Sequence, residues 1–461
     1  MSVKNVLSKR FSNGLILEAV YNPETEKTML AYSYSRNDKP ELAEIIKGPD
    51  GSEYQAIEPD DSRLKNGLVK LPSGLADYDS SKNLLEEINS HIDKYFNVRS
   101  EFIWIASLYV MMSWVYDDFY TLPYLRVLGN FGTGKSRFLE VVGSLCYKPI
   151  FAGGSISFAS VYRSLEDIRG TLVFDEADFR FSEMSAEIVK ILNAGIKKGS
   201  PVIRMDKDAK GKFTTQTFDA FGPKIIASRE KFRDSALESR CLREYLLPHK
   251  NTGRNFHLDK EFEESTITLR NKLLSFRLKK AGLIKTDESA LGEIGIKFPR
   301  LCQTALAIAS LARSIDTGLL EVIRPYFLDY ERELVEDQGS DIKSDVLIAI
   351  EIAKNLEWTD KNPDNFKLTM KDIANQFDNE FFEEYTGDRI FTASKNISPK
   401  MIGKLVGDLG FKKHRDGKGF YISFPESQEV LDRNLNRYGL NNIDFLKTKV
   451  GEINPEDISL S

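Results

Sequence analysis

Residues 124–136, YLRVLGNFGTGKS, join a short β-prone run to a glycine-rich loop that ends in Lys-Ser. The segment that follows, SRFLEVVGSLCY at residues 136–147, has helical periodicity. The loop fits the pattern G-x-x-x-x-G-K-[ST], whose glycines let backbone N–H groups turn inward around a phosphate. The start of the helix adds a partial positive charge. This stretch therefore predicts an α/β fold with a P-loop for a nucleotide.

The individual positions of the loop have expected roles. Lys135 is expected to reach the β- and γ-phosphates of ATP, and the Ser136 hydroxyl is expected to bind Mg²⁺. The residues expected to bind nucleotide are Gly129, Asn130, Phe131, Gly132, Thr133, Gly134, Lys135, Ser136 and Arg137. ATP and Mg²⁺ are thus the predicted cofactors.

A second acidic motif, TLVFDEAD at residues 171–178, follows about forty residues later. Its apolar half predicts a central strand, and its end presents Asp175 and Glu176 where open α/β sheets bind their ligands. Asp175 is expected to hold Mg²⁺, and Glu176 to orient and deprotonate the attacking water. The two motifs together predict ATP hydrolysis.

The segments around these motifs alternate between β-prone and helical patterns, as in an open α/β sheet. We expect an ATPase module over residues 76–335, with the α/β core reaching about residue 250 and a helical lid at 251–335. Residues 1–75 contain short strand patterns and predict a small β-rich N-terminal unit. A polar stretch near 335–345 precedes a further domain at 345–425, and residues 426–461 are expected to form a C-terminal tail.

Composition narrows the class of protein. The chain has 461 residues, 41% hydrophobic and 29% charged, as in soluble globular proteins, and its net charge of -5 requires any nucleic-acid contact to come from local patches. Cys146, Cys241 and Cys302 lie far apart without metal-ligand spacing, which argues against a zinc site or a disulfide framework. The apolar run at 102–116 would reach about 23 Å as a helix, short of the roughly 30 Å of a bilayer core. We therefore expect a cytoplasmic protein without a membrane partner.

The order of the motifs resembles that of the AAA+ ATPases. It is most similar to MCM-like replicative helicases and to helicase- or primase-associated ATPases of phages and mobile genetic elements. The resemblance covers roughly residues 80–335 and implies an AAA+ core with a helical lid, assembled as a homo-oligomeric, hexameric ring on DNA, with other replication proteins as further partners. The zinc-bearing N-terminal domain typical of MCM proteins has no counterpart in this sequence.

Family members place a hairpin before the strand that carries a polar sensor residue. Here the candidate hairpin is IRMDKDAKGKFTTQTF, residues 203–218, and its Lys207, Lys210 and Lys212 are expected to contact DNA. A solvated surface turn is the alternative for this hairpin. The sensor position falls on Ser228, where many members have asparagine, so this sequence departs from the family pattern there.

The resemblance also assigns three arginines. The segment ALESRCLREYLL, residues 236–247, maps an arginine finger onto Arg240, which would reach the phosphate bound by a neighbouring subunit. A surface ion pair is the alternative role. The segment FPRLCQTALAIASL, residues 298–311, resembles the sensor-2 helix, and its matching residue is Arg300, with Arg229 as a competing sensor.

Residues 345–424 predict three helices followed by a hairpin, a pattern that resembles a winged-helix domain. The third helix has Ser398 at its N-cap and Pro399 at its first position. We expect Met401, Leu405 and Leu409 to face the core, and the hairpin to turn at Asp416-Gly417. The residues expected to bind DNA on this helix and hairpin are Lys400, Lys404, Lys412, Lys413, Arg415 and Lys418. Docking of a protein partner is the alternative for this domain.

These observations favour an ATP-dependent DNA helicase or translocase that replicates a phage or mobile element. An AAA+ remodeller that loads another protein on DNA is the first alternative. A nucleotide-switched DNA-binding regulator with slow hydrolysis is the second.

Overall fold

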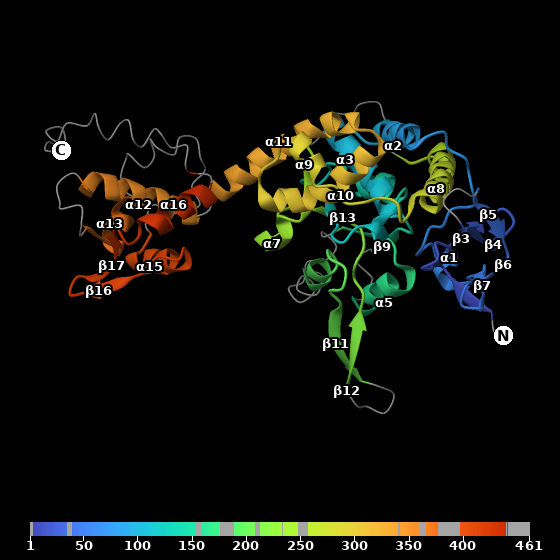
Figure 1. Ribbon diagram of the computed structural model, residues 1–461, viewed down its shortest axis with the longest axis horizontal. Coiled ribbons are helices and arrows are strands. Elements are labelled where there is room, and N and C mark those ends of the chain that lie inside the picture. Colours follow the sequence, from blue (N-terminus) through green and yellow to red (C-terminus); the bar gives the residue numbers. More distant parts are fainter. Residues whose placement is uncertain are drawn as a thin grey trace. The chain divides into compact units, whose positions relative to one another are not determined.

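The computed structural model describes residues 3–34, 39–152, 158–175, 189–207, 213–232, 234–247, 257–339, 342–358, 366–376, 397–438 and 440. The chain divides into two compact units, residues 1–328 and 329–461 (Figure 1). Within the described residues, no helix combines the length and the apolar character needed to cross a membrane.

A five-stranded parallel sheet forms the centre of the first unit. Its strands run in the order β14 (Cys241–Tyr245), β8 (Tyr124–Leu128), β13 (Lys224–Ser228), β10 (Leu172–Asp175) and β9 (Ile150–Ala152). All five residues of both β8 and β13 are buried, as expected for parallel strands that are covered on both faces. The predicted α/β class is confirmed, and β9 is a strand that the sequence analysis did not predict.

Helices connect and cover these strands. α4 (Lys135–Gly143) follows β8 through the glycine-rich loop, and α5 (Phe158–Ile168) precedes β10. Residues 189–194 are helical, and the short α7 (Ser235–Glu238) precedes β14. α2 (Ser81–Tyr95) is capped by the Ser80 side chain, and α3 (Ser100–Trp114), with the short 3-10 helix η1 (Tyr116–Asp118) after it, is buried along most of its length. The apolar run thus lies inside the protein, as predicted.

A two-stranded hairpin lies between the helical residues 189–194 and β13. Its strands are β11 (Val202–Lys207) and β12 (Phe213–Phe218), which pair antiparallel from Val202 opposite Phe218 to Lys207 opposite Phe213. In Figure 1 both strands extend away from the parallel sheet. The predicted hairpin is confirmed along its arms.

The N-terminal residues form two small sheets. One contains β2 (Ser8–Arg10), β3 (Ile16–Asn22), β4 (Lys27–Ser33) and β5 (Glu41–Ala43), and the other contains β1 (Lys4–Val6), β7 (Glu53–Ala56) and β6 (Ile45–Lys47). The short helix α1 (Ser62–Lys65) follows. Buried residues of these sheets, such as Leu17 and Tyr54, belong to the same hydrophobic cluster as Leu165 and Leu172 of the α/β core. The N-terminal sheets therefore pack on that core.

After β14, the described part of the first unit continues with α8 (Lys260–Lys280), α9 (Ser289–Ile294), α10 (Pro299–Ile315) and the start of α11 (Gly318–Gly339). The boundary between the two units falls within α11.

The second unit continues with α12 (Ile342–Trp358), β15 (Phe366–Thr369), α13 (Met370–Asn375), α15 (Pro399–Asp408), β16 (His414–Asp416), β17 (Gly419–Phe424) and α16 (Gln428–Arg437). Its antiparallel sheet has the order β15-β17-β16. Three helices and a hairpin therefore occur in the predicted order. β15 and α16 were not predicted, and Leu431 of α16 is fully buried in the core of this unit.

Two local predictions in this unit are wrong. Met401 is 46% exposed, because the buried residues of α15 and its end are Ile402, Leu405, Val406 and Leu409, which place Met401 beside the core-facing stripe. The hairpin turns at Gly417-Lys418, since Asp416 is still paired with Gly419 across the strands. The Asp416 carboxylate accepts a hydrogen bond from the Lys418 amide and supports this turn.

Candidate functional site

The loop between β8 and α4 has backbone geometry that its glycines make possible. Gly132 and Gly134 have φ angles of 80° and 92°, which other residues rarely adopt. Gly129 is restricted by space, because a Cβ atom there would lie 2.6 Å from Thr133 Oγ1 and 2.8 Å from the Leu246 carbonyl oxygen. The backbone angles at Gly132 and Gly134 and the close approach at Gly129 therefore favour glycine at all three positions.

The Lys135 side chain turns back into this loop. Its Nζ donates hydrogen bonds of 2.8 Å to the carbonyl oxygens of Gly129 and Asn130, and the residue is only 8% exposed. Burial lowers the pKa of Lys135, Asp175 acts to raise it, and Arg229 lowers it further. The ammonium group thus lies in the curve of the loop, within electrostatic reach of the acidic strand end and of Arg229.

Ser136 and Asp175 meet at the carboxyl edge of the sheet. The Ser136 Oγ atom lies 3.5 Å from Asp175 Oδ2, although the two residues belong to different strand–loop segments. Between β8 and β10 lies β13, so this contact crosses the end of one strand. A hydroxyl and a carboxylate are hard oxygen donors of the kind that Mg²⁺ prefers.

The donor set fits a magnesium ion shared with a phosphate. Among the described residues, no group of three or more His, Cys, Asp or Glu side chains could hold a metal alone. Mg²⁺ commonly uses one or two carboxylates together with substrate phosphates, which matches Ser136 and Asp175 beside the loop. Glu176, the predicted base, lies outside the described residues.

Ser228, the predicted sensor, is the last residue of β13. Its hydroxyl accepts hydrogen bonds from Arg126 Nε at 2.9 Å and Nη2 at 2.7 Å, and it is fully buried. Its carbonyl oxygen accepts a hydrogen bond from the Gly129 amide at 3.2 Å. The backbone of Ser228 therefore supports the start of the phosphate loop, while its side chain binds a buried arginine.

That arginine belongs to a charged cluster that sequence reasoning missed. Arg126, in the middle of β8, is fully buried, binds the Glu238 carboxylate and stacks on Phe232 with its guanidinium carbon 3.6 Å from the ring centre. Glu238 also accepts a hydrogen bond of 3.0 Å from the buried Arg243. A charged residue inside an apolar strand was the available signal, because buried charges require partners.

Arg240 lies at the opposite edge of the sheet from the phosphate loop. It precedes Cys241, which pairs with Tyr124 at the beginning of β8, whereas the loop follows Leu128 at the end of that strand. Its guanidinium donates a hydrogen bond of 2.6 Å to the Asn193 side chain. The predicted finger thus has an intrachain partner on the amino edge.

The two sensor candidates occupy different places. Arg229 is exposed just after β13, and its charge acts on Lys135. Arg300 is exposed in the first turn of α10 and contacts Gln303 at 3.2 Å. One turn later, the Thr304 hydroxyl donates a hydrogen bond of 3.0 Å to the Ser239 carbonyl oxygen. Arg229 is therefore beside the phosphate loop, and the helix of Arg300 begins beside the Ser-Arg segment.

The predicted DNA-binding lysines of the first unit are Lys207, Lys210 and Lys212. Lys207 is the last residue of β11, and Lys210 and Lys212 lie outside the described residues.

In the second unit, the predicted basic residues are all exposed: Lys400, Lys404, Lys412, Lys413, Arg415 and Lys418. Lys413 Nζ donates a hydrogen bond of 2.7 Å to the Gly403 carbonyl oxygen and so ties the hairpin to α15. Lys412 pairs with Glu426 at 2.8 Å. Hydrogen bonds from Lys412, His414 and Ser423 lower the pKa of Glu426 to about 2.

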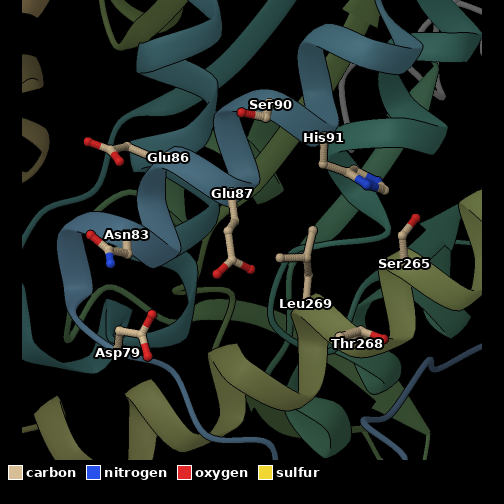
Figure 2. A pocket seen from close by; sticks show the side chains of 9 residues that line it. All are labelled: Asp79, Asn83, Glu86, Glu87, Ser90, His91, Ser265, Thr268 and Leu269. Carbon is tan, nitrogen blue, oxygen red and sulfur yellow. The ribbon is translucent and has the colours of Figure 1, made fainter.

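A pocket between α2 and α8 is not a phosphate site. Figure 2 shows the side chains that line it: Asp79, Asn83, Glu86, Glu87, Ser90, His91, Ser265, Thr268 and Leu269. Three of them are carboxylates and Lys272 pairs with Glu87 at the side, so the lining disfavours an anion. His91 lies 3.3 Å from the Thr266 hydroxyl and packs against Phe262.

Comparison with known proteins gives no family assignment. No family model matches the chain, and no match in sequence was found among curated proteins. The solved structure of an active helicase, SCCmec type IV Cch, aligns over 92% of this chain and 95% of its own, with 12% identity and a TM-score of 0.39. The C-terminal region of NrS-1 aligns over 88% and 95%, with 9% identity and a TM-score of 0.33. A full-length MCM homolog from Methanopyrus kandleri aligns over 69% and 68%, with 11% identity and a TM-score of 0.31. Similarities this low establish no activity, and the α/β assignment rests on the sheet and loop of this chain itself.

Proposed function

We propose that this chain hydrolyses ATP and uses the energy to translocate on and unwind DNA, as a hexameric ring of the AAA+ class. The observation that carries the proposal is the meeting of Lys135, Ser136 and Asp175 at one edge of the sheet. Replication of a phage or mobile element is the proposed setting. The order of the sequence motifs is the ground for this setting.

The residues at this edge would divide the work of phosphoryl transfer. The amides of the loop and the Lys135 ammonium would bind the β- and γ-phosphates, because both present positive charge in a partly dehydrated site. Ser136 and Asp175 would hold Mg²⁺, which neutralises charge on the phosphate oxygens when it is bound. Glu176, next in sequence to Asp175, would orient the attacking water. Arg229 is the proposed sensor of nucleotide within the same subunit.

The position of Arg240 supports assembly as a ring, because Arg240 lies too far from the phosphate loop of its own subunit to contact a nucleotide there. Tyr124 pairs with Cys241, the residue after Arg240, and lies five residues before Gly129. At about 3.3 Å per residue, the distance along the strand from Tyr124 to Gly129 is roughly 16 Å. An arginine on the amino edge would reach a γ-phosphate only across a subunit interface. The hydrogen bond from Thr304 to Ser239 holds the start of α10 beside the Ser239-Arg240 segment. Arg300, in the first turn of α10, would therefore also act on the nucleotide of the neighbouring subunit.

Two features would contact DNA. The β11–β12 hairpin extends from the sheet (Figure 1), and Lys207, the last residue of β11, precedes Lys210 and Lys212 in the sequence. In the second unit, the order of helices and hairpin and the exposed basic side chains fit a winged helix that binds the phosphate backbone.

The test is a forked-duplex unwinding assay with a matched variant. Glu176→Gln should retain ATP binding and lose both hydrolysis and unwinding, because only the water-activating carboxylate is removed. If the wild-type chain with ATP and Mg²⁺ hydrolyses ATP but never separates strands, the helicase proposal is rejected, and a loader or remodeller replaces it.

A nucleotide-switched regulator is the second candidate, favoured by the basic helix and hairpin of the second unit. Replacing Lys207, Lys210 and Lys212 with alanine separates the two candidates. A helicase should lose DNA-stimulated ATP hydrolysis, whereas a regulator should retain its DNA footprint, also in the Lys135→Ala variant.

A further inference from the structure

Lys224 is a buried lysine that is not part of the proposed phosphate site. It is the first residue of β13 and is fully buried, and among the described residues its Nζ forms no ion pair within 4.0 Å. Burial lowers its pKa to about 7, and Asp219 acts in the opposite direction. A buried amine of this kind is costly to keep unless its hydrogen bonds have a role.

The partners of Lys224 are backbone carbonyl oxygens at both ends of the hairpin segment. Nζ donates to Ala220 at 2.7 Å and to Gly222 at 3.0 Å, which follow β12, and it lies 3.5 Å from the oxygen of Gly195, which precedes β11. The Gly222 amide also donates to the Gly195 oxygen at 3.3 Å. One ammonium group therefore joins the chain where it enters the hairpin to the chain where it leaves.

The surrounding residues are shaped for this contact. A Cβ atom on Gly195 would lie 2.3 Å from Lys224 Nζ and 2.4 Å from the Ala220 oxygen, so only glycine fits. Nζ lies 5.1 Å from the centre of the Tyr124 ring, a cation–π contact. The Tyr109 hydroxyl accepts a hydrogen bond of 2.8 Å from the Lys224 amide and donates one of 2.8 Å to the Lys224 carbonyl oxygen. These two bonds hold the start of β13 in place.

The other end of the same strand touches the nucleotide loop. β13 ends at Ser228, whose carbonyl oxygen binds the Gly129 amide. β13 is paired along its length with β8 and β10, so it cannot bend independently of the two strands that carry the nucleotide motifs. A short buried strand thus has the phosphate loop at one end and the base of the hairpin at the other.

We propose that Lys224 is a positioning residue that fixes the base of the β11–β12 hairpin to β13, and so couples DNA contact at the hairpin to the nucleotide loop. The inference rests on the proposed function for its DNA partner. The contacts of Lys224 with the base of the hairpin do not depend on that function.

The experiment compares Lys224→Met with Lys197→Met in the full chain. Methionine retains most of the apolar stem and removes the donors, while Lys197 is an exposed lysine close to the same turn that stacks on Tyr120. The first readout is hydrogen–deuterium exchange of peptides spanning 194–202 and 216–224, with α4 as an internal reference. Lys224→Met should accelerate exchange in those two peptides alone. The second readout is ATP hydrolysis with and without single-stranded DNA, where the stimulation should fall about fivefold or more at unchanged basal rate.

Each outcome decides one proposal. Unchanged exchange and unchanged stimulation in Lys224→Met overturn the positioning role. A wild-type chain that hydrolyses ATP without any DNA stimulation overturns the helicase proposal instead, and the exchange data then decide the role of Lys224 alone. If Lys224→Met does not fold, Lys224→Gln is measured in the same way, because its amide has fewer N–H donors on a side chain one atom shorter and cannot reach the carbonyl oxygens at both ends of the hairpin segment together. A folded Lys224→Gln with wild-type exchange and stimulation also overturns the inference.

Discussion

Replacing Glu238 with glutamine is expected to destabilise the first unit by about 3–5 kcal/mol, because the change removes the charge that two buried arginines share. The side chains of Arg126 and Arg243 are 0% and 1% exposed, and that of Glu238 is 10% exposed. Glutamine has nearly the same volume as glutamate, so the cavity term is small. Most of the cost arises from guanidinium groups that stay buried without this carboxylate.

Urea unfolding measures this cost in a Trp358→Phe background. Of the three tryptophans, Trp104 and Trp114 then report fluorescence from the first unit alone. The expected loss lowers the unfolding midpoint by about 1–1.7 M, since the slope of the free energy with urea is on the order of 3 kcal/mol/M for a unit of this size. Adding Arg243→Met to Glu238→Gln should restore part of the stability, because one buried charge is removed with its partner.

Glu244→Gln is the matched control. Glu244 pairs with Arg99 through side chains that are 12% and 31% exposed, so its loss should cost about 1 kcal/mol or less. Equal midpoints for Glu238→Gln and Glu244→Gln would refute the reasoning that the Arg126–Glu238–Arg243 cluster is held by its charges.

Three further results are expected. Gly129→Ala should weaken the binding of a fluorescent ATP analogue about tenfold, because its Cβ atom would lie 2.8 Å from the rigid Leu246 carbonyl oxygen; wild-type affinity would contradict the tight approach. Asp175→Asn should lower Mg²⁺-dependent ATP hydrolysis about a hundredfold or more in a phosphate-release assay while the fold is retained, whereas an unchanged rate would remove Asp175 from the metal site. Burial and the charge of Lys94 lower the pKa of His91 from 6.5 to about 4. His91 therefore binds its proton more weakly in the folded chain, and stability that is present above pH 6.5 is lost as the pH falls toward 4. Between pH 7 and pH 4.5 the wild-type chain should lose about 2–3 kcal/mol more than His91→Gln in urea unfolding, and equal losses would exclude the histidine.

Local rules predicted the elements around the nucleotide site. The glycine-rich loop, the apolar strand before Asp175 and the buried helix at 100–114 follow from spacing, periodicity and the conformational freedom of glycine, all of which act within a few residues. The N-cap at Ser398 and the arms of the hairpin are predictable for the same reason.

Contacts between distant segments were beyond these rules. Nothing near Ser228 in sequence shows that its hydroxyl binds Arg126, which lies 102 residues earlier. Met401 was assigned to the core by a repeat of four, which selects a stripe of a helix but does not say where the stripe is centred. β9, three residues long, has too few residues for a periodic signal and is held by its pairing with β10.

The sequence by itself determined that the chain has a glycine-rich loop, an acidic strand end and a hairpin, in that order along the chain, because each is a local pattern of residue types. Only the tertiary structure decided that Ser136 and Asp175 lie 3.5 Å apart, that Arg240 lies on the opposite edge from its own loop, and that Lys224 joins the two ends of the hairpin segment. These relations depend on the order in which strands enter the sheet. That order is set by the burial of both faces of each strand against neighbours that come from anywhere in the chain.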